Sequence, residues 1–475
     1  MSENTALHFG SVSEMSKKVK ICVFDFYLYI RKQILPSVKK IARIPDYNDL
    51  DQNTISTILS DPDQMSKIME MNRRYLHWDE VRYRVEEDKA MPVWAILKIL
   101  RNNGLKTIHV CGLNLKYSLL PDFQEWLHHI DRDSAGFVNL ETPGEKNVRR
   151  YVISSLMEEA IASSQMEGAA TTRKDAKKML RTQRKPKNTS ELMIYNNYVA
   201  MELIKNSLDL DMNVDLILKL HKTITNGTLH EGPEWEGRFR EDNETVVGDT
   251  SREDVIFHVP PKHENLPSLV QELCDFINND TKEFVHPIIK GIIIHFLVGY
   301  IHPFVDGNGR LARTLYYWYV MKKGYWMMEY TSISRIIKKS QTKYGIAYQY
   351  SETDEYDLTY FIRFNLVCIE EAVEALKAYV LRKTEEQKKI AKMIESNPDL
   401  NINEMSILKD YSKEYSPFTI KELSVRYPIS YQTARSCIKH LCEMGYVKSV
   451  SKDRKTVLYT VTDDKDTWNV RFNSS

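Results

Sequence analysis

Apolar residues recur every three or four positions along most of the chain, and this spacing predicts amphipathic helices and a mainly α-helical fold. Breaks in the pattern are few, because the 475 residues include only 16 prolines and 17 glycines. Helices are expected at residues 63–84, 91–103, 121–132, 148–164, 190–207, 214–225, 266–278, 287–301 and 309–323.

Between Gly232 and Pro261 the helical period gives way to two short β-like runs, residues 245–247 and 255–259, with Gly248-Asp249 as the link between them. This change predicts a small β-hairpin inserted into a helical domain. The apolar residues 21–35 fit a strand or a buried helix equally well, and both interpretations stay open.

A Pro/Gly break at residues 141–144 marks the first expected domain boundary. It separates a mostly helical N-terminal region, residues 1–145, from a core at residues 146–380. No chemistry is assigned to the N-terminal region, although residues 75–79 (YLHWD) are expected to pack on the core. Residues 381–398 read as a polar helical connector that ends at Asn397-Pro398, and the last domain covers residues 399–475.

The last domain shows the order helix, turn, helix, hairpin, which predicts a winged helix. Thr419 and Ser430 are the expected N-caps of its two helices, and Gly445 ends the second one. Strands at residues 447–450 and 456–460 flank a charged tip. DNA contact is a secondary expectation, because winged helices also serve as dimerisation and protein-docking modules; the candidate contacts are Gln432, Arg435, Lys439, Lys452, Arg454 and Lys455.

Composition narrows the function classes. The formal net charge is +1, so any nucleic-acid binding must depend on a local patch. The six cysteines include no CxxC pair, which argues against a disulfide framework or a zinc site and suits a reducing cytosol. The first residues lack the order of a signal peptide, and no apolar run reaches the ~20 residues of a membrane span, so a cytoplasmic protein without membrane contact is expected.

Candidate phosphate chemistry is concentrated in residues 302–313, with the sequence HPFVDGNGRLAR. Pro303 ends the preceding helix, and Gly307-Asn308-Gly309 permit positive φ and close backbone approach. Consecutive N–H groups that open the next helix form an anion nest. Arg310 and Arg313 lie three apart, so they share one helical face that suits a phosphate.

The same segment holds a carboxylate and a base. Asp306 is placed to hold Mg²⁺ on the phosphate, and His302 is the only nearby side chain expected to accept a proton near neutral pH. Phe304 is expected to anchor the loop in the core. Each feature alone is ordinary, since a GNG turn is usually only a turn, but a structural explanation does not account for all of them within twelve residues.

Residues 302–313 match the motif of the Fic family, HxFx(D/E)GNGRxxR, at every defined position, and the resemblance extends over residues 146–380. It implies a Fic-type helical core in which His302 is the general base for a Ser, Thr or Tyr hydroxyl of the target. Asp306 would bind Mg²⁺, and Asn308 with the backbone of Gly307 and Gly309 would hold the α- and β-phosphates. Arg310 would hold the leaving pyrophosphate, and Arg313 the γ-phosphate.

A second segment lies upstream. Ser163 and Glu167 share a helical face, and Gly168 is a natural helix terminator, so a solvated helix end is the plain interpretation. The segment also resembles the family's inhibitory motif, (S/T)xxxE(G/N), within an inhibitory helix at about residues 148–168. The resemblance implies that Glu167 pairs with Arg313 and misaligns ATP.

The hairpin resembles the family's flap, which we place at residues 237–261. The resemblance implies that Val246, Val247 and Gly248 pair with the main chain of the target, whereas the alternative is an ordinary surface hairpin. Tyr344 and Tyr348, four apart on one expected helix, are candidates to line an adenine pocket. Simple packing is the alternative for these tyrosines.

The resemblance therefore implies an autoinhibited protein adenylyltransferase, with ATP as co-substrate, Mg²⁺ as cofactor and an unidentified target protein. Self-modification and a homodimer are further family expectations. Three alternatives stay open: removal of AMP with Glu167 activating water, transfer of another phosphate-containing group, and a DNA-binding regulator whose core senses nucleotide.

Overall fold

The structure is a computed structural model that describes residues 41–46, 52–134, 145–249, 252–395, 399–414, 417–453 and 456–462. The undecided element at residues 21–35, the break at 141–144, and Arg454 and Lys455 lie outside the described residues.

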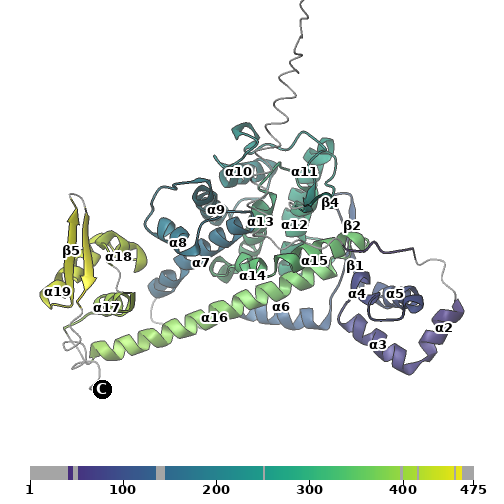
Figure 1. Ribbon diagram of the computed structural model, residues 1–475, viewed down its shortest axis with the longest axis horizontal. Helices are drawn as coiled ribbons and strands as arrows, with labels where there is room; N and C mark the ends of the chain where they lie inside the picture. The colour runs from purple at the N-terminus through teal and green to yellow at the C-terminus, as the bar shows by residue number, and fades with distance from the viewer. Residues whose placement is uncertain are drawn as a thin grey trace, which may run out of the picture.

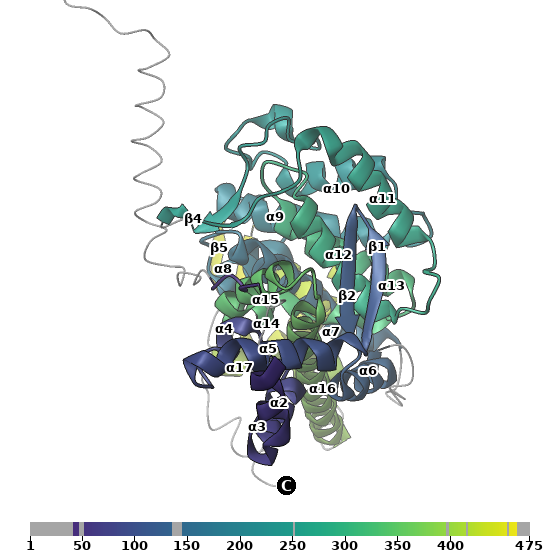
Figure 2. The same ribbon diagram turned by 90° about the vertical axis from the view of Figure 1, so that its right-hand side faces the viewer.

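The described residues are mainly helical, with three two-stranded antiparallel pairs, as the sequence pattern predicted (Figures 1 and 2). The helices are α2 (Gln52–Ser60), α3 (Pro62–Arg73), α4 (Trp78–Val81), α5 (Glu87–Asn102), α6 (Pro121–Ser134), α7 (Glu145–Met166), α8 (Arg173–Arg181), α9 (Thr189–Lys205), α10 (Val214–Thr225), α11 (Leu266–Asn278), α12 (Pro287–Ile301), α13 (Asn308–Lys322), α14 (Ile333–Lys339), α15 (Gln341–Thr353), α16 (Thr359–Glu395), α17 (Ile402–Glu414), α18 (Ile420–Arg426) and α19 (Tyr431–Glu443), with 3₁₀ turns η1 (Pro233–Trp235), η2 (His263–Asn265) and η3 (Trp326–Tyr330). The strand pairs are β1 (Leu105–Val110) with β2 (Leu113–Ser118), β3 (Val247–Asp249) with β4 (Arg252–His258), and β5 (Val447–Asp453) with β6 (Thr456–Val461).

The core forms around α12, which is apolar on nearly all sides and is almost completely buried. Its neighbours include α11, α13 and α16, and Figure 2 shows α12 enclosed among these helices. A helix that is hydrophobic all round is typical of a protein interior. This packing matters for the site because α12 and α13 frame the loop at residues 302–307.

The three helices α10, α11 and α12 have the bounds that the sequence pattern predicted, and α7, α9 and α13 differ from it only near their ends. The expected continuous helix at residues 63–84 is wrong. It divides into α3 and α4, because Tyr75 takes φ 51° and His77 caps α4 by accepting from the Asp79 N–H.

One hairpin was not expected from the sequence, and the strand bounds of the predicted hairpin differ from the expectation. The first is the β1–β2 hairpin, whose two-residue turn has Cys111 at φ 52° and Gly112 at φ 70°. These left-handed angles match a tight hairpin turn, so the Cys-Gly pair between alternating apolar positions was the available signal. The second is the flap register: β3 includes Gly248 and Asp249, which were expected in the link, while Thr245 and Val246 precede the strand.

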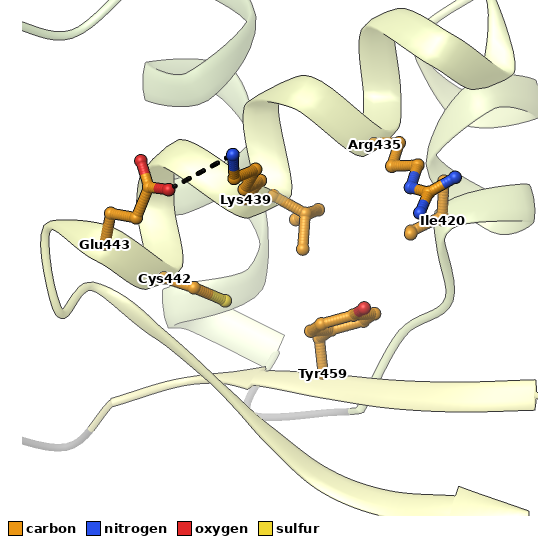
Figure 3. A pocket seen from close by; sticks show the side chains of 7 residues that line it. Ile420, Arg435, Lys439, Cys442, Glu443 and Tyr459 are labelled. Atoms are coloured by element: carbon orange, nitrogen blue, oxygen red, sulfur yellow. Dashed lines mark ion pairs between the residues drawn. The ribbon is translucent and has the colours of Figure 1, made fainter.

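The C-terminal domain is a winged helix, as predicted. Thr419 and Ser430 cap α18 and α19 through the N–H groups of Glu422 and Thr433, and the hairpin β5–β6 follows. A pocket of about 480 Å³ lies between α19 and β6, and Figure 3 shows Arg435, Lys439 and Tyr459 on its wall. Helix α18 lies against α8 of the core.

The helix α16 runs without a break through residues 380 and 381, where the core was expected to end and the connector to begin. The proposed domain boundaries therefore stay predictions. Within the described part of the chain, no helix combines the length and the apolarity that a membrane crossing needs.

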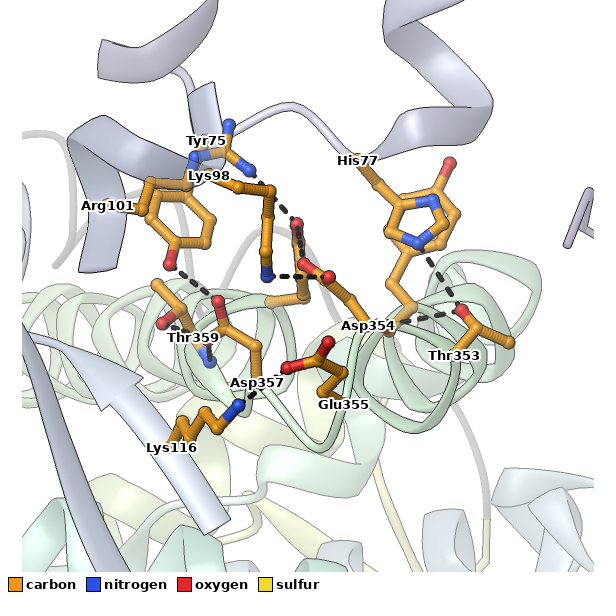
Figure 4. Close-up of polar contacts among 12 residues, drawn as sticks. Tyr75, His77, Lys98, Arg101, Lys116, Thr353, Asp354, Glu355, Asp357 and Thr359 are labelled. Carbon is orange, nitrogen blue, oxygen red and sulfur yellow. Dashed lines mark hydrogen bonds and ion pairs between the residues drawn. The ribbon is translucent and has the colours of Figure 1, made fainter. Parts of the chain in front are cut away.

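The N-terminal region contacts α15 and the turn between α15 and α16 (Figure 4). Lys98 of α5 pairs with Asp354 at 2.7 Å, and both side chains are buried. Tyr75 donates to Asp357 at 2.6 Å, and the His77 ring stacks on Tyr350 at 4.0 Å between centroids. The expectation that residues 75–79 pack on the core is thus confirmed. Breaking a buried charge pair is costly, so these contacts fix α15 relative to the N-terminal region.

Candidate functional site

His302 lies at the end of α12 in a left-handed conformation, with φ 46° and ψ 58°. This angle is uncommon for a residue other than glycine and needs support from its surroundings. The support comes from Arg240, which is buried and donates through Nε to the His302 carbonyl at 2.9 Å. The Nδ1 of His302 is 3.3 Å from the carbonyl of Gly299, so Nδ1–H donates there and Nε2 keeps its lone pair.

The surroundings keep the His302 ring neutral. Burial lowers the pKa of His302 to about 4, and the positive charges of His258 and Arg240 act in the same direction. The sign is favourable for a base, since a neutral ring is needed to accept a proton and this form is lost only as the pH falls through about 4.

The loop after His302 is closed by the side chain of Asn308. Its Oδ1 accepts from the Phe304 N–H at 3.0 Å, and its Nδ2 donates to the Phe304 carbonyl at 2.7 Å. Phe304 is fully buried, as expected of an anchor. Because these two bonds occupy the Asn308 amide, the backbone N–H of Asn308 is the group left to meet an anion.

A second histidine supports the same loop and was missed by the sequence argument. His221 of α10 stacks on Phe304 at 3.6 Å, its Nε2 donates to the Asp306 carbonyl at 2.8 Å, and its Nδ1 accepts from the Gly237 N–H at 3.0 Å. Burial lowers the pKa of His221 to about 4. Both nitrogens of His221 are occupied by structural bonds, so His302 stays the predicted proton acceptor of this loop. Nothing in the sequence distinguishes His221 from a core residue of α10.

The N-terminus of α13 lies beside this loop and has the features of an anion-binding site. Gly307 precedes it with φ 85°, an angle suited to glycine, and no side chain caps its first N–H groups. Arg310 is fully buried, donates to the Ile224 carbonyl at 3.2 Å and lies 3.4 Å from Asp306. Its buried Nε has no hydrogen-bond partner among the described residues. A buried unpartnered donor at a helix start favours an incoming anion.

Arg313 instead points at α7. Its Nε donates to Ser163 Oγ at 2.9 Å, and its Nη2 donates to the Ser163 carbonyl at 3.2 Å and to Glu167 Oε1 at 2.8 Å. A methyl group placed on Gly309 would collide with the same Glu167 oxygen. The Glu167 carboxylate therefore lies over the first turn of α13, where the helix dipole favours an anion.

A buried carboxylate anchors α7 two turns before Glu167. Glu159 is 1% exposed and accepts from Tyr317, Ser332 and Ser334, at 3.0 Å from the Tyr317 hydroxyl, the Ser332 hydroxyl and the Ser334 N–H. Burial raises the pKa of Glu159, and the hydrogen bonds from Ser334 and Ser332 together with the charge of Arg313 oppose that rise. These bonds fix the middle of α7 to α13 and to the start of α14. The end of α7 is therefore held in place, and Glu167 directly after it is held by its bond to Arg313.

Comparison with known proteins agrees with this geometry. Residues 211–320 match the model of the Fic/DOC family, and residues 400–464 match that of the winged helix DNA-binding domain. The chain contains a Fic domain.

Curated relatives match a little over a third of the chain. Protein adenylyltransferase Fic of Drosophila willistoni is 31% identical over 179 residues, which are 37% of this chain and 32% of that protein. The namesake of Nematostella vectensis is 29% identical over 181 residues, 38% of this chain and 37% of that protein. The chain thus spans about a third of the length of the curated relatives it matches.

Solved structures show a distant likeness. Fic-1 of C. elegans has a TM-score of 0.49 at 16% identity, with 79% of this chain and all of that chain covered (100%). A Fic family protein of Desulfovibrio desulfuricans has a TM-score of 0.48 at 18% identity, with 73% and 98% covered.

The Fic domain brings most of the expected site residues together. His302, Asp306, Arg310 and the start of α13 lie around one loop. Ser163 of α7 and Glu167, the residue just after α7, reach Arg313 beside it. Gly168 has φ 98° just after α7, as expected of a helix terminator.

Tyr344 and Tyr348 lie on α15 and face α12. The Tyr344 hydroxyl is 2.9 Å from His295 Nε2, and Tyr348 donates to the His295 carbonyl at 3.1 Å. The Tyr348 ring also packs on Phe361 at 4.3 Å. Both tyrosines are half-buried, so these contacts support packing, and they leave part of each side chain exposed.

The residues present suit a magnesium ion bound mainly through a nucleotide. The described residues contain no cluster of three or more protein ligands. The Asp306 side chain is 45% exposed, and it adjoins the anion site at α13. Mg²⁺ commonly binds one or two carboxylates together with substrate phosphates and water, so a single carboxylate at this place is sufficient.

Proposed function

We propose that the Fic domain is a protein adenylyltransferase, which transfers AMP from Mg-ATP to the hydroxyl of a Ser, Thr or Tyr side chain. The observation that carries this proposal is the loop at residues 302–307, which joins a neutral histidine to an uncapped helix start with a buried, unpartnered arginine donor. The names of the relatives agree with this reaction.

In the proposed reaction, the hydroxyl oxygen of the target attacks the α-phosphorus of ATP. A new phosphorus–oxygen bond forms, the bond to the β-phosphate oxygen breaks, and pyrophosphate leaves. The hydroxyl proton passes to Nε2 of His302, which the Gly299 contact leaves free. Arg310 and the first N–H groups of α13 stabilise charge on the phosphates, and such positioning with charge neutralisation is the main source of rate in phosphoryl transfer.

Mg²⁺ would be held by Asp306, where it would neutralise negative charge on the bound nucleotide. Tyr344 and Tyr348 stay the candidates for the adenine pocket. We assign positioning of the target to the flap, because Val246, just before β3, and Ile256 of β4 are 42% and 40% exposed. An exposed strand edge with apolar side chains suits pairing with an extended segment.

Inhibition is the second part of the proposal. Glu167 pairs with Arg313, which would otherwise hold the γ-phosphate. The Glu167 carboxylate also lies over the first turn of α13. The site would then admit ATP in a misaligned position until α7 moves. Removal of AMP by the same site stays an alternative, in which Glu167 would activate water.

The first test uses ATP labelled on the α-phosphate and, in parallel, on the γ-phosphate, with Mg²⁺ and the full chain carrying Glu167→Gly. We expect the α-label to become covalently attached to protein while the γ-label does not, since only AMP is transferred. Attachment of the γ-label would indicate phosphate transfer instead. If neither label attaches, the assignment as an adenylyltransferase is contradicted. Release of labelled AMP from an AMP-modified protein by the wild-type chain, which keeps Glu167, would favour AMP removal.

DNA binding by the winged helix is a second candidate function, favoured by the family match at residues 400–464. Gln432, Arg435 and Lys439 lie on the exposed side of α19. The exposed Lys439 also lies 3.6 Å from Glu443, and such surface pairs contribute little. Arg435 is therefore the stronger candidate.

We expect fluorescence anisotropy with a labelled DNA duplex to detect salt-dependent binding that Arg435→Ala weakens. Loss of one phosphate contact should lower the slope of log affinity against log salt by about 1. Lys174→Ala, at an exposed cation on α8, is the matched control and should leave the slope unchanged. Equal slopes for both variants, or no binding at low salt, would point to protein docking instead.

A further inference from the structure

His258, the last residue of β4, lies between two acceptors. Its Nε2 is 2.7 Å from the Tyr300 carbonyl, and its Nδ1 is 3.0 Å from Oε1 of Glu352. A carbonyl oxygen only accepts, and so does an ionised carboxylate. A neutral His258 ring carries one N–H and can donate to only one of these acceptors. Both contacts are hydrogen bonds only if either His258 or Glu352 carries one additional proton. An imidazolium ring would satisfy both acceptors at once, because each of its two nitrogens donates.

The bridge joins three elements of the structure, β4, α12 and α15. His258 belongs to β4 and lies opposite Val247 of β3 in the flap. Tyr300 is two residues before His302 on α12, and its ring contacts the His258 ring at 5.3 Å. Glu352 lies in the last turn of α15, four residues after Tyr348. The side chains of His258 and Glu352 are only 11% and 15% exposed, so the pair is shielded from most solvent competition.

Several charged and titratable groups of the described residues lie around the ring. Glu352 faces it from α15, and Tyr300 and His302 lie on the α12 side. Tyr356 of the α15–α16 turn packs edge-on against Tyr300 at 5.7 Å. From the start of the flap, Arg240 donates to the carbonyls of Pro261 and His302. Its guanidinium keeps its charge throughout the physiological pH range.

We propose that His258 is a positioning residue, a protonated latch that holds the flap on the end of α12, and that loss of its proton releases the flap. Neutral His258 can donate to only one of its two acceptors, so β4 would lose its bond either to α12 or to α15. The latch concerns the order of the flap, and only its effect on target binding rests on the proposed function.

The pH dependence has a definite sign. The latch needs the protonated ring, so the order of the flap is expected at lower pH and is lost as the pH rises. His302 needs the neutral ring and loses it only as the pH falls through about 4. His258 therefore sets an upper pH limit for the order of the flap, and His302 sets a lower pH limit for proton acceptance. As the pH rises, the flap loses order while His302 stays neutral.

Hydrogen–deuterium exchange of the full chain tests the latch without any target. Exchange in peptides that cover Val247–Asp249 and Ile256–Pro261 is compared between about pH 6 and pH 9, after correction for the intrinsic pH dependence of exchange. We expect protection in the wild type to fall roughly tenfold or more across this range, the effect of losing a charged hydrogen bond. His258→Gln and Glu352→Gln should show low protection that does not change with pH.

His263→Gln, at a histidine on η2 next to the flap, is the matched control and should keep the wild-type pH dependence. Histidine ¹⁵N NMR supplies a direct measurement of the ring at neutral pH, where we expect both nitrogens of His258 to carry protons. A neutral ring in that spectrum would overturn the proposal, and so would flap protection that is independent of pH in the wild type. Because neither measurement uses ATP, failure of the adenylyltransferase assignment would leave these results unchanged.

Discussion

We expect Glu167→Gly to raise the rate of AMP transfer by about five- to 150-fold, the range for a conformational coupling of about 1–3 kcal/mol. The variant removes the carboxylate that pairs with Arg313 at 2.8 Å and lies over the first turn of α13. Arg313 keeps its bonds to Ser163, so the guanidinium stays in place and becomes available to the γ-phosphate. The measurement is the initial rate of α-label incorporation at saturating ATP.

Two further variants separate charge from chain flexibility in this test. Glu167→Gln keeps the length of the side chain and removes the charge, so it should activate as well. Gln165→Gly loosens the same end of α7 and keeps the carboxylate, so it should not. Glu167→Gly could instead transfer AMP no faster than the wild type while its melting temperature is unchanged. In that case Glu167 does not inhibit the reaction, and its pair with Arg313 is only structural.

The sequence predicted the helical core better than its surroundings, for physical reasons. α10, α11 and α12 carry long apolar patterns with clear ends, such as the cap at Asn213 and the proline at position 287, so local signals were sufficient. The division between α3 and α4 depends on Tyr75, whose hydroxyl bonds Asp357 across 282 positions. Such a tertiary contact overrides local helix preference and cannot be read from a short window.

The candidate site likewise contains residues that local sequence signals reveal and residues that only tertiary contacts reveal. The segment at residues 302–313 was recognisable because one stretch of chain holds most of its chemistry. The residues that support it come from distant positions and are ordinary in isolation: Arg240 holds the His302 carbonyl, and His221 stacks under Phe304. Only the fold brings them together. The anchoring role of Glu159 was hidden for the same reason, since its partners lie on α13 and at the start of α14.

The second large effect is expected at His302. In the Glu167→Gly background, His302→Ala should lower AMP transfer by roughly 10²- to 10⁴-fold, the usual contribution of a positioned general base. ATP binding should be nearly unchanged, because the ring bonds Gly299 and makes none of the contacts of Arg310 or of the α13 start. The measurements are α-label incorporation and, separately, the affinity for ATP.

The backbone at this position requires a matched variant, because His302 has φ 46° and alanine is strained in that region. Asn tolerates left-handed angles better than most residues, so His302→Asn keeps the loop while removing the basic ring. Loss of activity in both variants with unchanged ATP affinity assigns the effect to the missing base. If His302→Asn transfers AMP at nearly the parent rate, the proton leaves the hydroxyl by another route and His302 serves the loop instead of the chemistry. A pH–rate profile gives the independent check: the base is neutral above about pH 4, so His302 should cause no loss of rate between about pH 7 and pH 5.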